Sequence, residues 1–515
     1  MNLIQKFILF LFIFNSKINC FNKFSKPKNL NKINNLPGLE SEINFNHYSG
    51  YLQVSNYHFL HYWFVESQND PENDPIIFWF NGGPGCSSMD GLLKEMGPYL
   101  VNPDGRSLRL NKYSWNKNAS VVYIESPVGV GYSYSEAWSL IEIDDEQVLR
   151  EINIYMGFNL EKIIFLKTAK ENYEAVKQFF KIYPSFRNNY LFISGESYAG
   201  VYVPSLSALI VDGQNEYPLK LTGMMIGNGY MNARLDIDTT IKFAYAHGLV
   251  DEKLWQLMRE ECCNGCFDGC DLSMMSNYFC QNKVEEIFEF VWLGGLNPYD
   301  LYRDCDTFSP LNSPKMHALR RGLLPTKLNE RIVAKSILNR NTRSARFINT
   351  DDLNNVTEVT SNVATDPGIP CLDDSDATRY MNLKEVRQAL NIPSHLGNWS
   401  ICNEDVSNNY NQIYSDMSPF VKKVLGAKVK TLLYYGDTDM ACNFLLGQQF
   451  ASQLGYRVIM DAKPWRVDGQ IAGFKTKYTN GLTFITIRGA GHMVPEWRAP
   501  QIFYAIQNFL SYGEV

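Results

Sequence analysis

Short apolar runs alternate with amphipathic stretches along most of the chain. Runs at residues 75–80, 120–124 and 190–193 each end in a turn that contains Gly, Ser or Pro, and an amphipathic stretch covers residues 172–182. Such runs predict buried strands, and the amphipathic stretch predicts a helix. Strands that alternate with helices are typical of an α/β fold with a mostly parallel sheet, whose functional loops lie at the carboxyl ends of the strands.

The alternation follows a predicted hairpin, residues 50–54 and 59–65, and is interrupted further along the chain. That part of the chain contains a cysteine cluster, a basic stretch and helical patterns at 241–246, 252–261 and 284–292. The strand and helix patterns then resume, at 428–435, 483–487 and 500–511. We therefore expect one core built from residues 21–228 and 361–515, with a mainly helical cap inserted at 229–360.

The N-terminal segment, residues 1–20, has the pattern of a secretory signal peptide: Lys6 in a polar leader, the apolar run 7–14, and then polar residues. The alternative is a transmembrane anchor, but crossing a bilayer takes about 20 apolar residues, and this run is far shorter. No other run is apolar enough to span a membrane. We therefore expect no membrane anchor and passage through the secretory pathway, either to the lysosome or out of the cell.

Composition and charge narrow the class of protein. Hydrophobic residues make up 45% of the 515 residues and charged residues 20%, which predicts a globular chain with a large core. The net charge of −6 argues against binding to nucleic-acid phosphates. Aromatic residues, at 14%, favour a pocket that holds apolar side chains.

Eleven cysteines are present, and five of them lie between residues 262 and 280. Such a cluster could hold zinc, but in a secreted chain disulfides explain it better. Sequons at Asn118, Asn355 and Asn398 predict glycosylation and agree with the secretory route.

Ser197 lies in the run GESYAG, residues 195–200, directly after an apolar run and before a helical pattern. Small residues around a serine let a strained strand-to-helix turn hold the hydroxyl above the sheet edge, as in the nucleophile elbow of hydrolases. The fifth position is Ala199 rather than the usual Gly. A serine hydroxyl is a weak nucleophile, so it also needs a base and a third group that orients the base.

Asp439 and His492 can supply those two groups. Asp439 follows the apolar run at 428–435, and His492 stands in a glycine-flanked loop after the run at 483–487. The other six histidines lack such a setting. The chain order Ser, Asp, His is that of the α/β-hydrolase fold.

A glycine-rich run, NGGPGCSS at residues 81–88, follows the apolar run at 75–80. Acyl transfer needs preorganised N–H donors for the developing oxyanion, and glycines let backbone N–H groups face a bound carbonyl. The N–H of Tyr198, next to the nucleophile, is the expected second donor. A phosphate-binding loop is the alternative, but no Lys-Ser/Thr pair follows this run.

Five motifs, in this order, resemble those of the serine carboxypeptidases: residues 79–88, 125–131, 195–200, 436–443 and 489–495. The resemblance runs from about residue 36 to the C-terminus. It implies a catalytic triad of Ser197, Asp439 and His492, with the acid at the second aspartate of its motif rather than the first. It also implies an oxyanion hole formed by Gly83 and Tyr198.

The same resemblance implies that Asn81, Glu95 and Glu196 hold the terminal carboxylate of the substrate, which would make the enzyme an exopeptidase. We expect it to need no metal or cofactor and to release C-terminal, preferably hydrophobic, residues from peptides at acid pH. The alternative is a protective partner that stabilises lysosomal glycosidases, as some members of the family do, with or without peptidase activity. A homodimer is a further expected partnership.

Disulfides are also implied by the resemblance. It pairs Cys86 with Cys402, Cys305 with Cys371, and Cys262 with Cys280, and it joins Cys263 to either Cys266 or Cys270. Cys442 matches a free thiol near the active site. Residues 149–167 depart from the family pattern and are either a true insertion or a retained intron.

Overall fold

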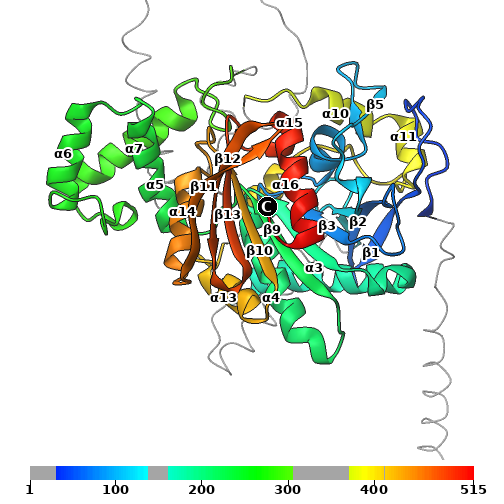
Figure 1. Ribbon diagram of the computed structural model, residues 1–515. Coiled ribbons are helices and arrows are strands. Elements are labelled where there is room, and N and C mark those ends of the chain that lie inside the picture. The colour runs from blue at the N-terminus through cyan, green and yellow to red at the C-terminus, as the bar shows by residue number, and fades with distance from the viewer. Residues whose placement is uncertain (1–30, 137–160, 306–370, 411) are drawn as a thin grey trace, which may run out of the picture.

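The computed structural model describes residues 31–136, 161–305, 371–410 and 412–515 (Figure 1). The predicted signal peptide, residues 1–20, lies outside this range and stays a prediction. Within the described residues, none of the helices combines the length and the apolar character needed to cross a membrane.

A mixed sheet of eleven strands organises the described part of the chain, in the order β1-β2-β6-β3-β8-β9-β10-β13-β12-β11, with β7 paired to β2. These strands are β1 (His47–Gln53), β2 (His58–Val65), β3 (Ile76–Phe80), β6 (Ser120–Ile124), β7 (Tyr134–Ser135), β8 (Leu191–Glu196), β9 (Leu221–Gly227), β10 (Lys430–Gly436), β11 (Val458–Val467), β12 (Gln470–Tyr478) and β13 (Leu482–Ile487). Within this order, neighbouring strands along the stretch β6-β3-β8-β9-β10-β13 are parallel. The pairs on either side of this stretch are antiparallel. The predicted α/β-hydrolase fold with a mostly parallel central sheet is confirmed.

Helices cover both faces of the sheet (Figure 1). One face packs against α3 (Glu161–Ile182), α4 (Ala199–Asp212), α13 (Ser418–Gly426) and α14 (Phe444–Gln453), and the other against α16 (Ala499–Tyr512). Alternate side chains of β3 enter the two cores, Phe78 on the α3 side and Trp79 on the α16 side. A strand buried on both faces is a continuous apolar run, which is why residues 75–80 could be recognised.

The other strands and α-helices outside the cap are short and lie in the loops around the sheet. They are β4 (Tyr99–Val101), β5 (Leu108–Leu110), α10 (Ser375–Met381), α11 (Lys384–Ala389), α12 (Glu404–Asn409) and α15 (Val494–Trp497).

The cap begins directly after β9 and stands beside the sheet (Figure 1). It contains α5 (Ala233–Ala246), α6 (Glu252–Cys263) and α7 (Tyr278–Leu293), which include the three predicted helical segments. Asn232 caps α5, because its side chain accepts a hydrogen bond from the N–H of Leu235. The inserted helical cap is thus confirmed, whereas its predicted end at residue 360 lies outside the described residues and stays a prediction.

Four disulfides link the described residues: Cys86–Cys402, Cys262–Cys280, Cys263–Cys270 and Cys305–Cys371. Cys262–Cys280 ties α6 to α7, and Cys263 takes Cys270 rather than Cys266 as its partner. Four of the five clustered cysteines are therefore bonded to one another, which supports disulfides over zinc ligands. Among the described cysteines, Cys266 is free and exposed, and Cys442 is free and buried.

Two predicted features fall partly outside the described residues. Asn118 and Asn398 are exposed, as glycosylation would require, but Asn355 lies outside. Helix α3 begins at Glu161, so the backbone of residues 161–167 is helical, while the rest of the unusual segment 149–167 is not described.

Six strands were not predicted: β4, β5, β7, β9, β11 and β12. β9 contains Gly223 and Gly227, which weaken a strand pattern. The β11–β12 hairpin lies at the edge of the sheet, and most side chains of β11 are exposed. An edge strand in contact with solvent carries no apolar run, so hydrophobic periodicity could not detect it.

Candidate active site

Ser197 occupies a strained turn between β8 and α4. Its φ is +62°, in the left-handed region that side chains other than glycine rarely adopt. The surrounding backbone holds it there, because its N–H donates to Gly227 O (3.0 Å) and its carbonyl accepts from Tyr230 N (2.9 Å). This is the strand-to-helix geometry expected of a nucleophile elbow.

The departure at Ala199 is explained by its neighbours. A Cβ placed on Gly195 would lie 2.7 Å from the Cβ of Ala199 and 2.4 Å from Phe80 O. The Ala199 methyl group therefore uses the space that the missing side chain of Gly195 leaves free.

His492 and Asp439 meet in the interior. His492 Nδ1 lies 2.7 Å from Asp439 Oδ2, and the two side chains are 3% and 0% exposed. Asp437, the other candidate, instead accepts a hydrogen bond from Gly489 N (2.6 Å). The structure thus pairs His492 with the second aspartate, and Nε2 is left as the ring nitrogen that can exchange a proton with a substrate or nucleophile.

The surroundings of His492 favour its charged form. Burial lowers the pKa of His492. Three other effects outweigh burial and raise the pKa above its ordinary value of 6.5: the charge of Asp439, the hydrogen bond between Asp439 and His492, and the charge of Glu196. A general base must be neutral, so this shift works against catalysis at acid pH unless one of the neighbouring charges is removed.

Asp439 is held by several donors besides His492. Asn228 Nδ2 donates to Oδ2 (2.7 Å), Ala441 N to Oδ1 (2.9 Å) and Cys442 N to Oδ2 (3.2 Å). These bonds fix the carboxylate in the orientation that meets the imidazole.

Asn228, at the carboxyl end of β9, is a site residue that the sequence did not reveal. Its amide nitrogen binds Asp439, while its Oδ1 accepts from Gly436 N (3.0 Å) at the end of β10. A polar residue between two glycines, directly after an apolar run, was the signal available, but β9 itself was not recognised.

The glycine-rich run 81–88, hereafter the oxyanion loop, passes directly over the nucleophile. A Cβ on Gly82 would lie 2.4 Å from Tyr198 N and 2.8 Å from the Cβ of Ser197. Gly83 has a φ of +111°, which requires glycine. The backbones of the two expected donors, Gly83 and Tyr198, therefore belong to segments in close contact.

Asn81, Glu95 and Glu196 converge beside the elbow. Asn81 Nδ2 donates to Glu196 Oε1 (3.0 Å) and approaches Glu95 Oε1 (3.4 Å), and Asn81 Oδ1 accepts from Trp79 Nε1 (2.6 Å). Glu95 ends a single π-helical turn, Gly91–Glu95, of a kind often found at functional sites. Both glutamates are buried, and one oxygen of each has no hydrogen-bond partner.

These two carboxyl groups share protons. Burial, and then the charge of Glu196, hold the pKa of Glu95 well above its ordinary value. Burial also raises the pKa of Glu196 to about 7, although the charge of His492 and a bond from Glu95 oppose it. One carboxyl is thus protonated near neutral pH, and the pair can accept a third carboxylate only with another proton.

Asp90 joins them, as carboxylate oxygens of Asp90, Glu95 and Glu196 lie within 4.8 Å of one another. Among the described residues this is the cluster whose atoms converge as metal ligands would. Burial, followed by the charge of Asp374, holds the pKa of Asp90 well above its ordinary value.

Comparisons with known proteins agree with this geometry. The family model described as serine carboxypeptidase matches residues 37–512. The lysosomal protective protein of Mus musculus is 37% identical over 486 residues, 93% of each chain. Serine carboxypeptidase ctsa-4.1 of Caenorhabditis elegans is 34% identical over 491 residues, with the same coverage. The crystal structure of Kex1(delta)p, a prohormone-processing carboxypeptidase from Saccharomyces cerevisiae, superposes with a TM-score of 0.67 at 21% identity, covering 95% of this chain and 96% of its own, and shows a shared fold.

Replacement of Asn228 should impair turnover more than folding. In Asn228→Ala, Asp439 loses one donor, and we expect kcat to fall about 10- to 100-fold with little change in KM. Asn189→Ala is the matched control, since Asn189 is equally buried and binds only backbone carbonyls far from the site, Pro71 O and Asp74 O. Equal losses of kcat in both variants, or none in Asn228→Ala, would contradict the assignment.

The raised pKa values also predict a pH-dependent stability. A carboxyl with a higher pKa in the folded chain stabilises the fold fully below its unfolded pKa and loses that contribution as pH rises through the folded value, about 7 for Glu196. The double variant Glu95→Gln/Glu196→Gln should therefore exceed wild type in Tm at about pH 8 and lose this advantage near pH 4.5. A Tm difference that does not vary with pH would show that the pair does not share protons.

Proposed function

The chain belongs to the serine carboxypeptidase family, and on that basis we propose that it releases C-terminal, preferably hydrophobic, residues from peptides at acid pH. Ser197, His492 and Asp439 act as nucleophile, base and orienting acid. The observation that carries the proposal is the contact between Asn81 and Glu196, because Glu196 directly precedes Ser197. A site for the substrate carboxylate one residue from the nucleophile restricts cleavage to the last peptide bond.

In this mechanism, Ser197 Oγ attacks the last peptide carbonyl while His492 Nε2 takes the hydroxyl proton. The N–H groups of Gly83 and Tyr198 stabilise the oxyanion, and Asp439 stabilises the imidazolium. His492 then gives its proton to the leaving amine, and the C-terminal residue departs. Water, activated by His492, hydrolyses the acyl-enzyme in the second half of the cycle.

An acid optimum follows from the shared protons. A substrate carboxylate adds a negative charge beside Glu95 and Glu196, so binding favours the protonated pair. Protonation of Glu196 also removes one of the charges that raise the pKa of His492. The same proton that allows the substrate carboxylate to bind therefore also helps to keep His492 neutral.

Aromatic rings beside the nucleophile support the preference for hydrophobic residues. The ring of Tyr198 stacks on Tyr230 with centroids 5.9 Å apart and packs edge-on against Tyr410 and Tyr202, both at 5.5 Å. Tyr410, the partly exposed member of this group, offers an apolar surface near the nucleophile, whereas Tyr198, Tyr202 and Tyr230 are buried in the core beneath it.

A protective role toward lysosomal glycosidases is the second candidate. It is favoured by the 37% identity to a relative named lysosomal protective protein, which also favours the lysosome over secretion. We propose that such a role, including a homodimer, coexists with catalysis. Purification of active enzyme in lysosomal extracts without any glycosidase would count against it.

Ser197→Ala should abolish peptide hydrolysis and labelling by organofluorophosphates, with a loss in kcat of at least about 10⁴-fold. The fold should persist, because one hydroxyl at the surface of the elbow contributes little to stability. Labelling that survives in the folded variant would place the nucleophile elsewhere.

Substrates with and without a terminal carboxylate should differ in pH profile. For free-acid peptides we expect an optimum at about pH 4.5 to 6, since the Glu95–Glu196 pair must be protonated. Peptides with an amidated C-terminus bring no carboxylate, so their optimum should move upward toward neutral pH, because the neutral fraction of His492 increases with pH. Identical profiles for the two substrates would remove the physical basis of the exopeptidase proposal.

A further inference from the structure

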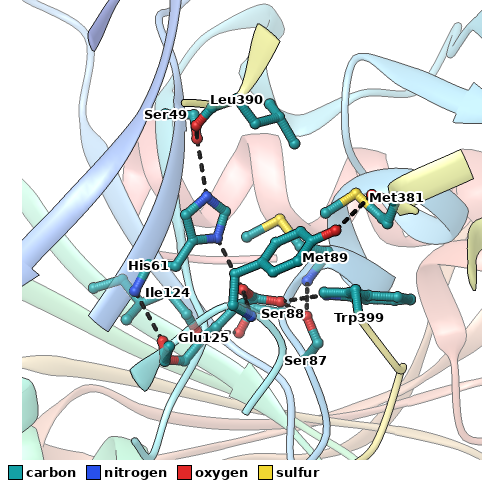
Figure 2. A network of polar contacts seen from close by, with 12 residues as sticks. Ser49, His61, Ser87, Ser88, Met89, Ile124, Glu125, Met381, Leu390 and Trp399 are labelled. Carbon is teal, nitrogen blue, oxygen red and sulfur yellow. Dashed lines mark hydrogen bonds and ion pairs between the residues drawn. The ribbon is translucent and has the colours of Figure 1, made fainter. Parts of the chain in front are cut away.

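A second group of buried polar side chains lies beneath the oxyanion loop, centred on Glu125 (Figure 2). Glu125 directly follows β6 and is fully buried. Its Oε2 accepts from His61 Nδ1 (2.8 Å) and Tyr132 N (2.7 Å), and its Oε1 accepts from Trp399 Nε1 (2.7 Å) and from the Ser87 hydroxyl. Four donors from four separate parts of the chain thus converge on one carboxylate.

Both ring nitrogens of His61 are engaged in hydrogen bonds. Ser49 Oγ has one proton, which it donates to the carbonyl oxygen of Leu390 (2.8 Å), because a carbonyl can only accept. His61 Nε2 lies 2.9 Å from the same Ser49 oxygen and must then be the donor. Nδ1 shares one further proton with Glu125 Oε2 (2.8 Å), so the ring is held from both sides.

Glu125 and the preceding residue, Ile124, are connected to the oxyanion loop at two adjacent serines. Ser87, in the loop, donates to Glu125, and its backbone N–H binds Ile401 O (2.7 Å). Ser88 Oγ donates to Ile124 O (2.5 Å) and accepts from Asn81 N (3.1 Å). The end of β6 therefore holds the C-terminal part of the loop.

The space around Glu125 is tightly filled. A Cβ on Gly131 would lie 1.8 Å from Glu125 Oε1, so the loop after β6 wraps the carboxyl group and admits no side chain there. A buried carboxyl group needs hydrogen-bond partners, so Glu125 and its donors hold one another in place. A shift of Ser87 would leave Oε1 with one donor, Trp399 Nε1, instead of two.

We propose that Glu125, held in place by His61, is a positioning residue that holds the oxyanion loop against the nucleophile. It acts through Ser87, so that the backbone of Gly83 keeps its place beside Ser197. The proposal rests on the oxyanion-hole assignment made above and adds to it the interaction that preorganises the hole.

Three variants test this role. Glu125→Gln keeps the size of the side chain, but its NH₂ group faces donors where the carboxylate accepts. Ser87→Ala removes the link to the loop and leaves the His61–Glu125 pair intact. Glu171→Gln is the matched control, because Glu171, on α3, forms a similar buried pair with His58 (2.6 Å) at the start of β2.

The readout compares a peptide aldehyde with the amino-acid product. The aldehyde adds covalently to Ser197 and puts its oxyanion in the hole, but it has no terminal carboxylate and so does not need Asn81, Glu95 or Glu196. In Ser87→Ala and Glu125→Gln we expect kcat to fall and the aldehyde inhibition constant to rise together, by about tenfold or more. Binding of the product should change by less than about twofold.

Two results would overturn the inference: wild-type kcat and aldehyde affinity in Ser87→Ala, or the same losses in Glu171→Gln as in the loop variants. Ser87→Ala decides the matter if Glu125→Gln does not fold, since it removes a single hydroxyl. Failure of the proposed function would look different, because Ser197→Ala would then retain activity whatever the loop variants do.

Discussion

The close passage of the oxyanion loop over Ser197 is the constraint on which the rest of the site depends. The backbone at Gly82 leaves no room for even a methyl group against Tyr198, so both segments must be held firmly from outside. The strained turn at Ser197 is anchored by the ends of β8 and β9 and by α4. The loop is anchored by the Cys86–Cys402 disulfide and by the hydrogen bond from Ser87 to the buried Glu125. The free-energy cost of this preorganisation falls on folding, so no reorganisation is needed when the oxyanion forms.

Under the proposed function, the same crowding couples substrate recognition to the protonation state of the base. Glu196 lies beside Glu95 and also contributes to the raised pKa of His492. In that proposal a single proton on this carboxyl pair affects two steps: it lowers the repulsion of the substrate carboxylate, and it weakens the field that keeps the imidazole charged. An enzyme with this arrangement can use a histidine base at a pH where an ordinary histidine is protonated.

The sequence predicted those parts of the structure that depend on neighbours along the chain. Ser197, Asp439 and His492 follow apolar runs in short loops, so their setting is visible locally. Asn228 and Glu125 escaped detection because their roles depend on partners 211 and 274 residues away, Asp439 and Trp399. The carboxylate site was inferred from the family resemblance and not from the residues themselves, since a glutamate next to a serine has no distinctive pattern. These groups lie together because they are buried at the same edge of the sheet. The spacing of residues along the chain does not show which residues are buried.

The central claim is that the paired carboxyls bind the terminal carboxylate of the substrate by taking up a proton. Calorimetry of peptide binding to the inactive Ser197→Ala variant, in buffers of different ionisation enthalpy near pH 7, measures that proton directly. A free-acid peptide should bind with uptake of between about half a proton and one proton, and the amidated peptide with none. Binding of the free acid without proton uptake would contradict the claim.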